Sequence, residues 1–276
     1  MATLQELRKR LRSIQSTQQL ASAMRTASTV KFSKVNRIHG NFGPYAKACR
    51  DMLAHLGSAG IPRETEDVSS RDAVVVFSGN RGLCGAFNTE LFRFLDQTLA
   101  DMDSPLLLAS GRKAASHLRE LGRVYEEFPL PDVPDYQDIK PLANRIRSLY
   151  TSGQANRVLA VYQHYENTLI QKPQLRQLLP ESGIPEGRDD ASLLYFPDRA
   201  TIGAQLAVSC LDAQVFDLAM ENASGAQAET LVAMSSACDN AEATAADLEI
   251  TINRRRQAEV TASVLETATG NLQQGE

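Results

Sequence analysis

Proline is absent from both ends of this chain, residues 1–43 and 198–276, and apolar residues recur in both at helical spacing. Near the start, Leu4, Leu7 and Leu11 alternate intervals of three and four, the repeat of a helix that packs against another helix. A helix rises 1.5 Å per residue, so the last segment alone could form a rod on the order of 100 Å long. The sequence therefore predicts two long helices that pair with each other.

The first helix is expected to run from about Thr3 into the mid-fifties, with a bend at Pro44. Its apolar seam is expected to continue from Ile14 through Leu20, Met24 and Ala27. We take Met1 as close to the mature start because this repeat runs on into the body of the chain, although an Arg-rich, acid-poor start also suits a transit peptide.

The second long helix is expected from about residue 198 onward. Its predicted seam contains Leu211, Val215, Leu218, Met234, Cys238, Ala241, Ala245, Leu248 and Ile252. A phase shift near residues 225–232 predicts that the partner of this helix changes along its length.

Between these ends, short apolar runs alternate with helical patterns. The run Ala-Val-Val-Val-Phe at 73–77 is typical of a buried parallel strand. Further strands are expected at 105–109 and 157–165, extended segments at 167–179 and 192–196, and helices at 89–100, 111–121 and 139–151. The predicted fold is α/β: a long antiparallel coiled coil of the N-terminal (1–57) and C-terminal (198–276) helices plus a central Rossmann-like α/β domain (72–197) with a mostly parallel sheet.

Composition excludes several classes of protein. Hydrophobic residues make up 43% and charged residues 22% of the 276 residues, which is ordinary for a water-soluble chain. No run of about 20 apolar residues stands out, so we expect membrane attachment only through partners. The four cysteines are scattered and form no CxxC pair, which argues against a disulfide framework and a structural zinc site and favours a reducing compartment.

Charge is distributed unevenly along the chain. Residues 1–40 hold eight Lys or Arg against the single Glu6, although the whole chain has a net charge of −4. The basic end therefore requires an acidic partner. Nucleic acid is one candidate, but interleaved aromatic residues and groove-reading motifs are missing, so we expect no nucleic-acid binding.

The segment 78–88, Ser-Gly-Asn-Arg-Gly-Leu-Cys-Gly-Ala-Phe-Asn, follows the first strand where nucleotide-binding folds place a phosphate loop. It lacks the lysine and hydroxyl residue of a P-loop and matches no dinucleotide fingerprint. A tight strand-to-helix turn is the favoured interpretation over a ligand site. Cys84 is interpreted as a packed small residue, with a reactive thiol at a helix start as the alternative.

No residue pattern indicates catalysis. The four histidines lie far apart without an HExxH motif, and no GxSxG marks a serine nucleophile. We therefore predict no catalytic, cofactor-binding or metal-binding residues. A cluster of three arginines, Arg254 to Arg256 followed by Gln257, interrupts the alanine-rich C-terminal helix. It is either a solvated charge run or a set of anchors for carboxylates of an enclosing partner.

Four sequence blocks in order over nearly the whole chain resemble the γ subunit of F-type ATP synthases. The blocks are Ser16-Thr17-Gln18-Gln19 with Ala23-Met24 and Lys31; Arg81-Gly82-Leu83-Cys84-Gly85; Asn167-Thr168 with Gln177-Leu178-Leu179-Pro180; and Glu221-Asn222-Ala223-Ser224, Val232-Ala233-Met234, Ala237, Asp239-Asn240-Ala241, Asn253, Arg256-Gln257-Ala258 and Thr261. Departures from the family pattern include Asn80, Thr26, Thr230, Ser235, Ile252, Ser263 and the segment 267–270.

The resemblance implies a non-catalytic rotary shaft that couples proton or sodium flow to ATP synthesis or hydrolysis. Its partners would be the α and β subunits, the ε subunit and a membrane ring of c subunits, at the cytoplasmic face of a bacterial or archaeal cell membrane. By resemblance, Arg256, Gln257, Arg81 and Cys84 would contact β, and Tyr195 would approach the c ring. Two other classes remain as alternatives: a free-standing α/β ligand-binding or enzymatic protein that dimerises through its coiled coil, and a basic coiled coil that binds nucleic acid.

Overall fold

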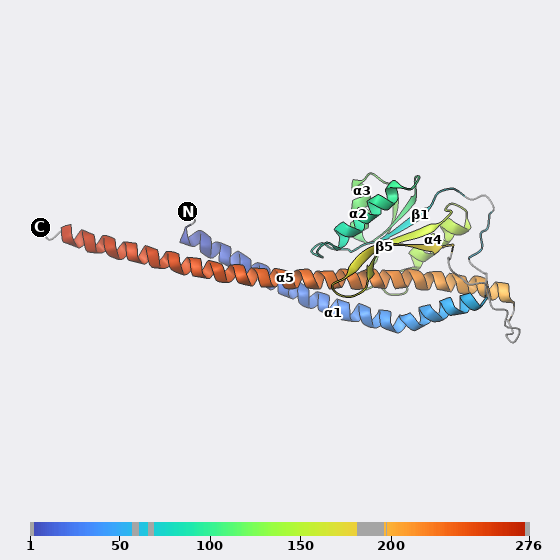
Figure 1. Ribbon diagram of the computed structural model, residues 1–276, viewed down its shortest axis with the longest axis horizontal. Coiled ribbons are helices and arrows are strands. Elements are labelled where there is room, and N and C mark those ends of the chain that lie inside the picture. The colour runs from blue at the N-terminus through green and yellow to red at the C-terminus, as the bar shows by residue number, and fades with distance from the viewer. Residues whose placement is uncertain (1–2, 57–60, 66–68, 181–195, 197, 274–276) are drawn as a thin grey trace. The chain divides into compact units, whose positions relative to one another are not determined.

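The computed structural model describes residues 3–56, 61–65, 69–180, 196 and 198–273, and it contains two compact units. The sheet unit comprises residues 28–232, and the helical unit combines the residues up to 27 with those from 233 onward. Two long helices contribute to both units, α1 (Leu4–Leu56) and α5 (Arg199–Gln273) (Figure 1). The two long terminal helices predicted from the sequence are therefore confirmed.

The two helices run antiparallel in the sheet unit. Arg199 at the start of α5 donates a hydrogen bond of 2.9 Å to the carbonyl of Leu56 at the end of α1. Further along, Ser224 of α5 donates to the side chain of Asn36 at 2.9 Å. Pro44 lies inside α1, and Figure 1 shows the helix bending in the half that contains this proline, as expected for a residue that removes one backbone hydrogen bond.

The apolar seam of α1 differs from the prediction. Beyond Ile14 the inward positions are Gln18, Ala21, Arg25 and Ser28, which continue the alternation of intervals of four and three, whereas Leu20 is 61% exposed. In the helical unit Ala21 packs with Met234 and Cys238, and the thiol of Cys238 lies 3.8 Å from the carbonyl oxygen of Gln18. The assignment of Leu20 and Ala27 to the seam was wrong because small and polar residues occupy the repeat there.

The surroundings of α5 change along its length. From 210 to 216 every residue is buried, so the helix is covered on all sides in the sheet unit. From 233 onward burial is confined to one narrow stripe. The stripe consists of Met234, Cys238, Ala241, Ala245 and Ile252, with Leu248 half-buried. This agrees with the phase shift in the sequence and its predicted change of partner.

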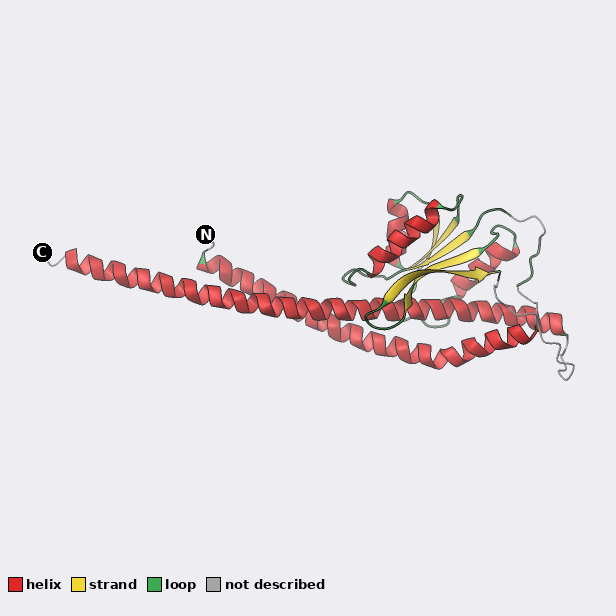
Figure 2. Cartoon of the chain, viewed as in Figure 1, coloured by secondary structure: helices red, strands yellow, loops and turns green. Residues whose placement is uncertain are grey.

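The sheet has five strands in the order β3-β2-β1-β4-β5 (Figure 2). The strands are β1 (Ala73–Phe77), β2 (Leu106–Ser110), β3 (Tyr125–Phe128), β4 (Val158–Tyr165) and β5 (Gln171–Leu179). Ala73 pairs with Leu106 on one side and with Val158 on the other; all neighbouring strands are parallel except β4 and β5, which form an antiparallel pair. The mostly parallel α/β sheet is confirmed.

Helices cover both faces of the sheet, and the alternation of side chains along β1 explains how. Val74 and Val76 pack in one cluster with α2 (Phe87–Ala100) and α3 (Arg112–Glu120). Val75 and Phe77 belong to the opposite cluster with α1, α5 and α4 (Lys140–Thr151). A strand buried on both faces needs a continuous apolar run, which the sequence of β1 supplies.

One strand of the sheet was missed by the sequence analysis, and one predicted extended segment could not be compared. The edge strand β3 was not predicted, because Tyr-Glu-Glu-Phe is short and its two glutamates are exposed. Its Glu126 receives a bidentate contact from Arg145 of α4, at 2.5 to 3.1 Å. The extended segment expected at 192–196 falls almost entirely outside the described residues.

Candidate functional site

The motif loop, residues 78–86, joins β1 to α2 as a tight turn held by the chain's own atoms. The backbone N–H of Gly79 donates to the side-chain oxygen of Asn88 at 3.1 Å. Two residues of the loop have left-handed backbone, Leu83 (φ 63°) and Gly85 (φ 53°). The Asn88 amide nitrogen lies 3.0 Å from the thiol of Cys84. These contacts support the favoured interpretation of a strand-to-helix turn.

A polar network anchors the loop to α1 and to the segment after β3. The amide of Asn80 donates to the carbonyl of Leu130 at 2.7 Å and to Asp132 at 3.2 Å. Lys31 of α1 binds the other oxygen of Asp132 at 2.5 Å. Burial by itself would raise the pKa of Asp132, but the hydrogen bonds from Lys31 and Asn80 outweigh it, so the pKa is lowered.

Cys84 is only 6% exposed, and its surroundings do not activate it. Burial raises the pKa of its thiol, with a hydrogen bond from Asn88 acting in the opposite direction. Since the thiolate is the nucleophilic form, a raised pKa makes the sulfur less reactive. The interpretation as a packed residue fits, and the one as a reactive thiol does not.

The other residues predicted to contact partner subunits are not buried as Cys84 is, or lie outside the described residues. The side chain of Arg81 is 73% exposed, and its Nε lies 3.6 Å from Asp132. In the helical unit, Arg256 and Gln257 are both exposed on α5, and the neighbouring Arg255 lies 3.6 Å from Glu259 one turn later. Tyr195 lies outside the described residues. These exposed side chains are available to another protein chain, and that contact stays a prediction.

Sequence reasoning did not find Lys31 and Asp132 as partners of the loop. They lie 101 positions apart in the chain; Lys31 belongs to the first of the four resemblance blocks, but Asp132 belongs to none of them. The only hint was the excess of basic residues in α1, for which the sequence predicted an acidic partner. One such partner is in the chain itself.

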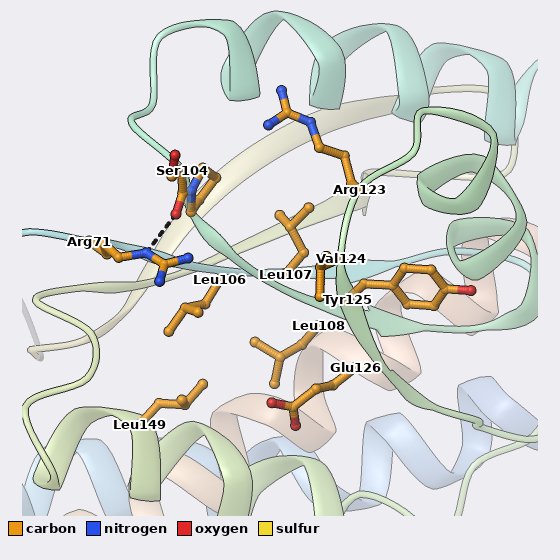
Figure 3. Close-up of a pocket in the computed structure, with 11 residues that line it drawn as sticks. Arg71, Ser104, Leu106, Leu107, Leu108, Arg123, Val124, Tyr125, Glu126 and Leu149 are labelled. Atoms are coloured by element: carbon orange, nitrogen blue, oxygen red, sulfur yellow. Dashed lines mark hydrogen bonds between the residues drawn. The ribbon is translucent and has the colours of Figure 1, made fainter.

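A mainly apolar cavity of about 200 Å³ lies beside the amino ends of β2 and β3. Figure 3 shows Leu106, Leu107, Leu108 and Leu149 around it, while the ring of Tyr125 points away. Arg71 donates from Nε to the carbonyl of Ser104 at 2.8 Å. The lining contains no histidine, lysine or cysteine, and its one carboxylate, Glu126, is bound by Arg145.

Two further observations concern metals and membranes. Within the described part of the chain, no three His, Cys, Asp or Glu side chains gather as metal ligands. Among the described residues, one helical stretch, Arg199–Leu265, contains an 18-residue window that is apolar enough to cross a membrane by length and composition alone. However, 56% of that window is buried inside the protein, and core helices of soluble proteins pass the same test.

Comparison with protein families gives one match over nearly the whole chain. A family model described as ATP synthase matches residues 3–271. A protein of Glaesserella parasuis named ATP synthase gamma chain is 30% identical, over 98% of this chain and 99% of its own length. Another of the same name, from Bacteroides thetaiotaomicron, is 28% identical over 99% of this chain and 100% of its own.

Solved structures with the same fold include two of the mitochondrial ATP synthase of Euglena gracilis. A chain in its OSCP/F1/c-ring assembly, rotational state 3, has a TM-score of 0.72 at 18% identity, covering 98% of this chain and 93% of that one. A chain of its rotor in rotational state 1 has a TM-score of 0.68 at 18% identity, covering 93% and 98%. The likeness extends over the helices and the sheet together.

Proposed function

This chain belongs to the ATP synthase family as a gamma subunit, the rotor of the central stalk, and from that premise we propose how it works. Ion flow turns a membrane ring of c subunits, the sheet unit is carried round with the ring, and the paired helices transmit the rotation. The β subunits then synthesise or hydrolyse ATP in turn. The terminal segments 1–57 and 198–276 would form the shaft and residues 72–197 its foot.

The observation that carries this proposal is the exposure of the end of α5. From 253 to 265 every described side chain is exposed except that of Arg255, which is half-buried. Most of the stability of a helix in a protein comes from packing one face against another element. A long helix that buries so little against its own chain requires an enclosing partner, and a ring of α and β subunits would provide one.

The proposal assigns contacts within that ring. Arg256 and Gln257 would donate to carboxylates or carbonyls of a β subunit, because the planar guanidinium can bind a carboxylate with two hydrogen bonds. Arg81 on the motif loop would meet an acidic segment of β, although Cys84 beside it is turned into the chain. Tyr195 would approach the c ring, and the ε subunit would bind the foot.

The chain would therefore be a peripheral subunit on the cytoplasmic face of a bacterial cell membrane, attached through its partners. One structure to which it is similar is described as an OSCP/F1/c-ring assembly, which supports a c ring as partner here. The coupling ion would be a proton or sodium. We assign no catalytic residue to this chain. The motif loop would serve as a contact surface for a β subunit.

Co-expression with the α and β subunits of the same organism tests the proposal. A tag on β is used for purification, and ATP hydrolysis is assayed. We expect this chain to co-purify in a fixed ratio and the turnover to depend on it. Recovery as a separate soluble dimer, with the α and β preparation unchanged, would contradict the proposal and favour a free-standing α/β ligand-binding protein.

A further inference from the structure

One polar turn of α5 lies against the sheet and has no role yet in the proposed function. It consists of Glu221, Asn222, Ala223 and Ser224, one of the sequence groups that carry the family resemblance. All four residues are buried, with exposed fractions of 9% for Glu221 and 6% for Asn222. The sheet unit ends at Val232, so this turn lies about two turns before α5 leaves that unit.

Glu221 and Asn222 bind groups at the carboxyl ends of two neighbouring strands, β4 and β1. An oxygen of Glu221 accepts the backbone N–H of Tyr165, the last residue of β4, at 3.1 Å. The ring Nδ1 of His164 contacts the same oxygen. The amide of Asn222 donates to the carbonyl of Ser78, the residue after β1, at 3.3 Å. The turn is therefore bonded directly to the backbone of the sheet.

The same turn is bonded to the other long helix. Ser224 donates to the side chain of Asn36 of α1 at 2.9 Å. Ala223, between the polar residues, packs in the apolar cluster that also contains residues of α1, α4 and the sheet. Within one turn, α5 thus makes hydrogen bonds to two strands and to the first helix.

The hydrogen bonds of this turn fix the helix in a way that its apolar contacts do not. Hydrophobic burial has no preferred direction, and small buried side chains such as Ala213 and Ala219 project little into neighbouring elements. A shift of the helix by one residue moves a side chain by about 1.5 Å along the axis and turns it by about 100°, which breaks a hydrogen bond. The backbone of Ser78 cannot follow such a shift, because its N–H is bonded to the carbonyl of Ser110 in the sheet at 2.9 Å.

We propose that Glu221 and Asn222 are positioning residues that fix α5 to the sheet against the torque of rotation. The inference rests on the proposed function, in which rotation passes between the sheet unit and the paired helices. With both side chains in place, a turn of the sheet moves α5 by the same angle. Without them the helix yields first, and part of each rotational step is lost before it reaches the β subunits.

Hydrogen–deuterium exchange of the purified full-length chain, resolved to single residues by mass spectrometry, tests the contact itself. Glu221→Ala removes the acceptor and should make the backbone N–H of Tyr165 exchange at least tenfold faster, with the amides of β1 as the reference for global opening. Glu221→Gln keeps an oxygen in the same place and should preserve most of the protection. Circular dichroism verifies that all variants are folded.

Asp212→Ala is the matched control. It removes another buried carboxylate of α5, but one that binds the flexible side chain of Lys140 of α4, at 2.5 Å, instead of a backbone group of the sheet. We expect this variant to leave the exchange of the Tyr165 amide unchanged relative to the amides of β1.

Coupling is measured in membranes that carry the assembled complex, as ATP-driven ion transport divided by ATP hydrolysis. The Glu221→Ala, Asn222→Ala double variant should lower this ratio at least twofold, whereas Glu221→Gln and Asp212→Ala should keep it. A merely structural role would lower assembly, transport and hydrolysis together and leave the ratio unchanged in every variant.

Two results overturn the proposal: unchanged exchange of the Tyr165 amide in Glu221→Ala, or as many ions transported per ATP by the double variant as by the unaltered chain. Failure of the unaltered chain to assemble with α and β would contradict the proposed function, and with it the role in rotation. The exchange measurement uses this chain alone, so it still decides whether Glu221 fixes α5 to the sheet.

Discussion

The imidazole Nε2 of His39 on α1 lies 2.8 Å from the carboxylate Oδ1 of Asp217 on α5. The hydrogen bond to Asp217 raises the pKa of His39. For Asp217 burial acts to raise the pKa, but the hydrogen bond and charge of His39 outweigh it and lower the pKa. The two shifts describe one ion pair, which connects the two long helices within the sheet unit.

This pair should make the stability of the sheet unit depend on pH. A raised pKa in the folded state means that the contribution of His39 is complete below its ordinary pKa of 6.5 and is lost as the pH rises through the folded value. The stabilising contribution of Asp217 is complete above its ordinary pKa of 3.8. It is lost as the pH falls through the lowered pKa of the folded state.

We therefore expect the free energy of unfolding to decrease from about pH 6 to about pH 8 and His39→Gln to flatten that decrease. Urea unfolding at three pH values measures how the free energy of unfolding changes with pH in the unaltered chain and in His39→Gln. His55→Gln is the matched control, because His55 is exposed and its hydrogen bond among the described residues is to the carbonyl of Asp51 in its own helix. If His39→Gln leaves the slope unchanged, the pair does not contribute in this way.

The motif loop should tolerate an alanine at Gly82 but not at Gly85. Gly85 has a φ of 53°, and an added Cβ would lie 2.3 Å from Glu229, whereas nothing lies within 4 Å of a Cβ at Gly82. Gly85→Ala should lower the free energy of unfolding by about 1–3 kcal/mol, and Gly82→Ala by less than about 0.5 kcal/mol. Thermal or urea unfolding compares them; equal losses would show that the close approach to Glu229 has no energetic consequence.

The thiols should react slowly in the folded chain. All four cysteines are buried, and burial raises the pKa of Cys84. With Ellman's reagent near pH 8, we expect little colour from the native chain within minutes and four equivalents after unfolding. Cys84→Ser should leave the slow native reaction unchanged. A rapid native reaction that disappears in Cys84→Ser would restore the interpretation of a reactive thiol.

The elements with strong periodic or apolar signals could be predicted from the sequence. The run at β1 is apolar on both faces, and the structure buries all five residues. The start of α1 was also clear, but its later seam was not, because Gln18 and Ser28 occupy inward positions that hydrophobicity alone assigns to the surface. A strict seven-residue count from Leu4 and from Leu7 would have found them.

The side-chain sites could not be predicted, since they depend on residues that only the tertiary fold brings together. Asp132 meets Lys31 and Asn80 across 101 and 52 positions of sequence. A cavity of about 270 Å³ beside the start of α2 likewise has both Glu90 and Glu229 in its lining, although in the sequence they are ordinary charged residues of two helices. The strand β3 was missed because an edge strand with exposed glutamates lacks a buried face.

The double variant Arg256→Ala, Gln257→Ala should weaken coupling while leaving assembly largely intact. Both side chains are exposed in the helical unit, so their removal costs the chain itself little. ATP synthesis by membranes carrying the variant measures coupling, and co-purification with β measures assembly. Arg254→Ala, also exposed on the same helix, is the control and should have the smaller effect. Undiminished synthesis by the double variant would remove these two residues from the mechanism.

Truncation of α5 should be milder from Thr261 than from Leu248. The side chains described from 261 to 265 are all exposed. The longer deletion also removes Ile252, which is buried in the helical unit, and the half-buried Leu248. Losing one buried isoleucine costs about 2–5 kcal/mol in helix pairing, so the remaining end of the helix should fray.

Circular dichroism measures the helical content of each truncated chain, and coupled ATP hydrolysis in the assembled complex measures the loss of activity. Equal loss from both truncations would show that contacts beyond Thr261, made to other subunits, outweigh the pairing of α1 with α5.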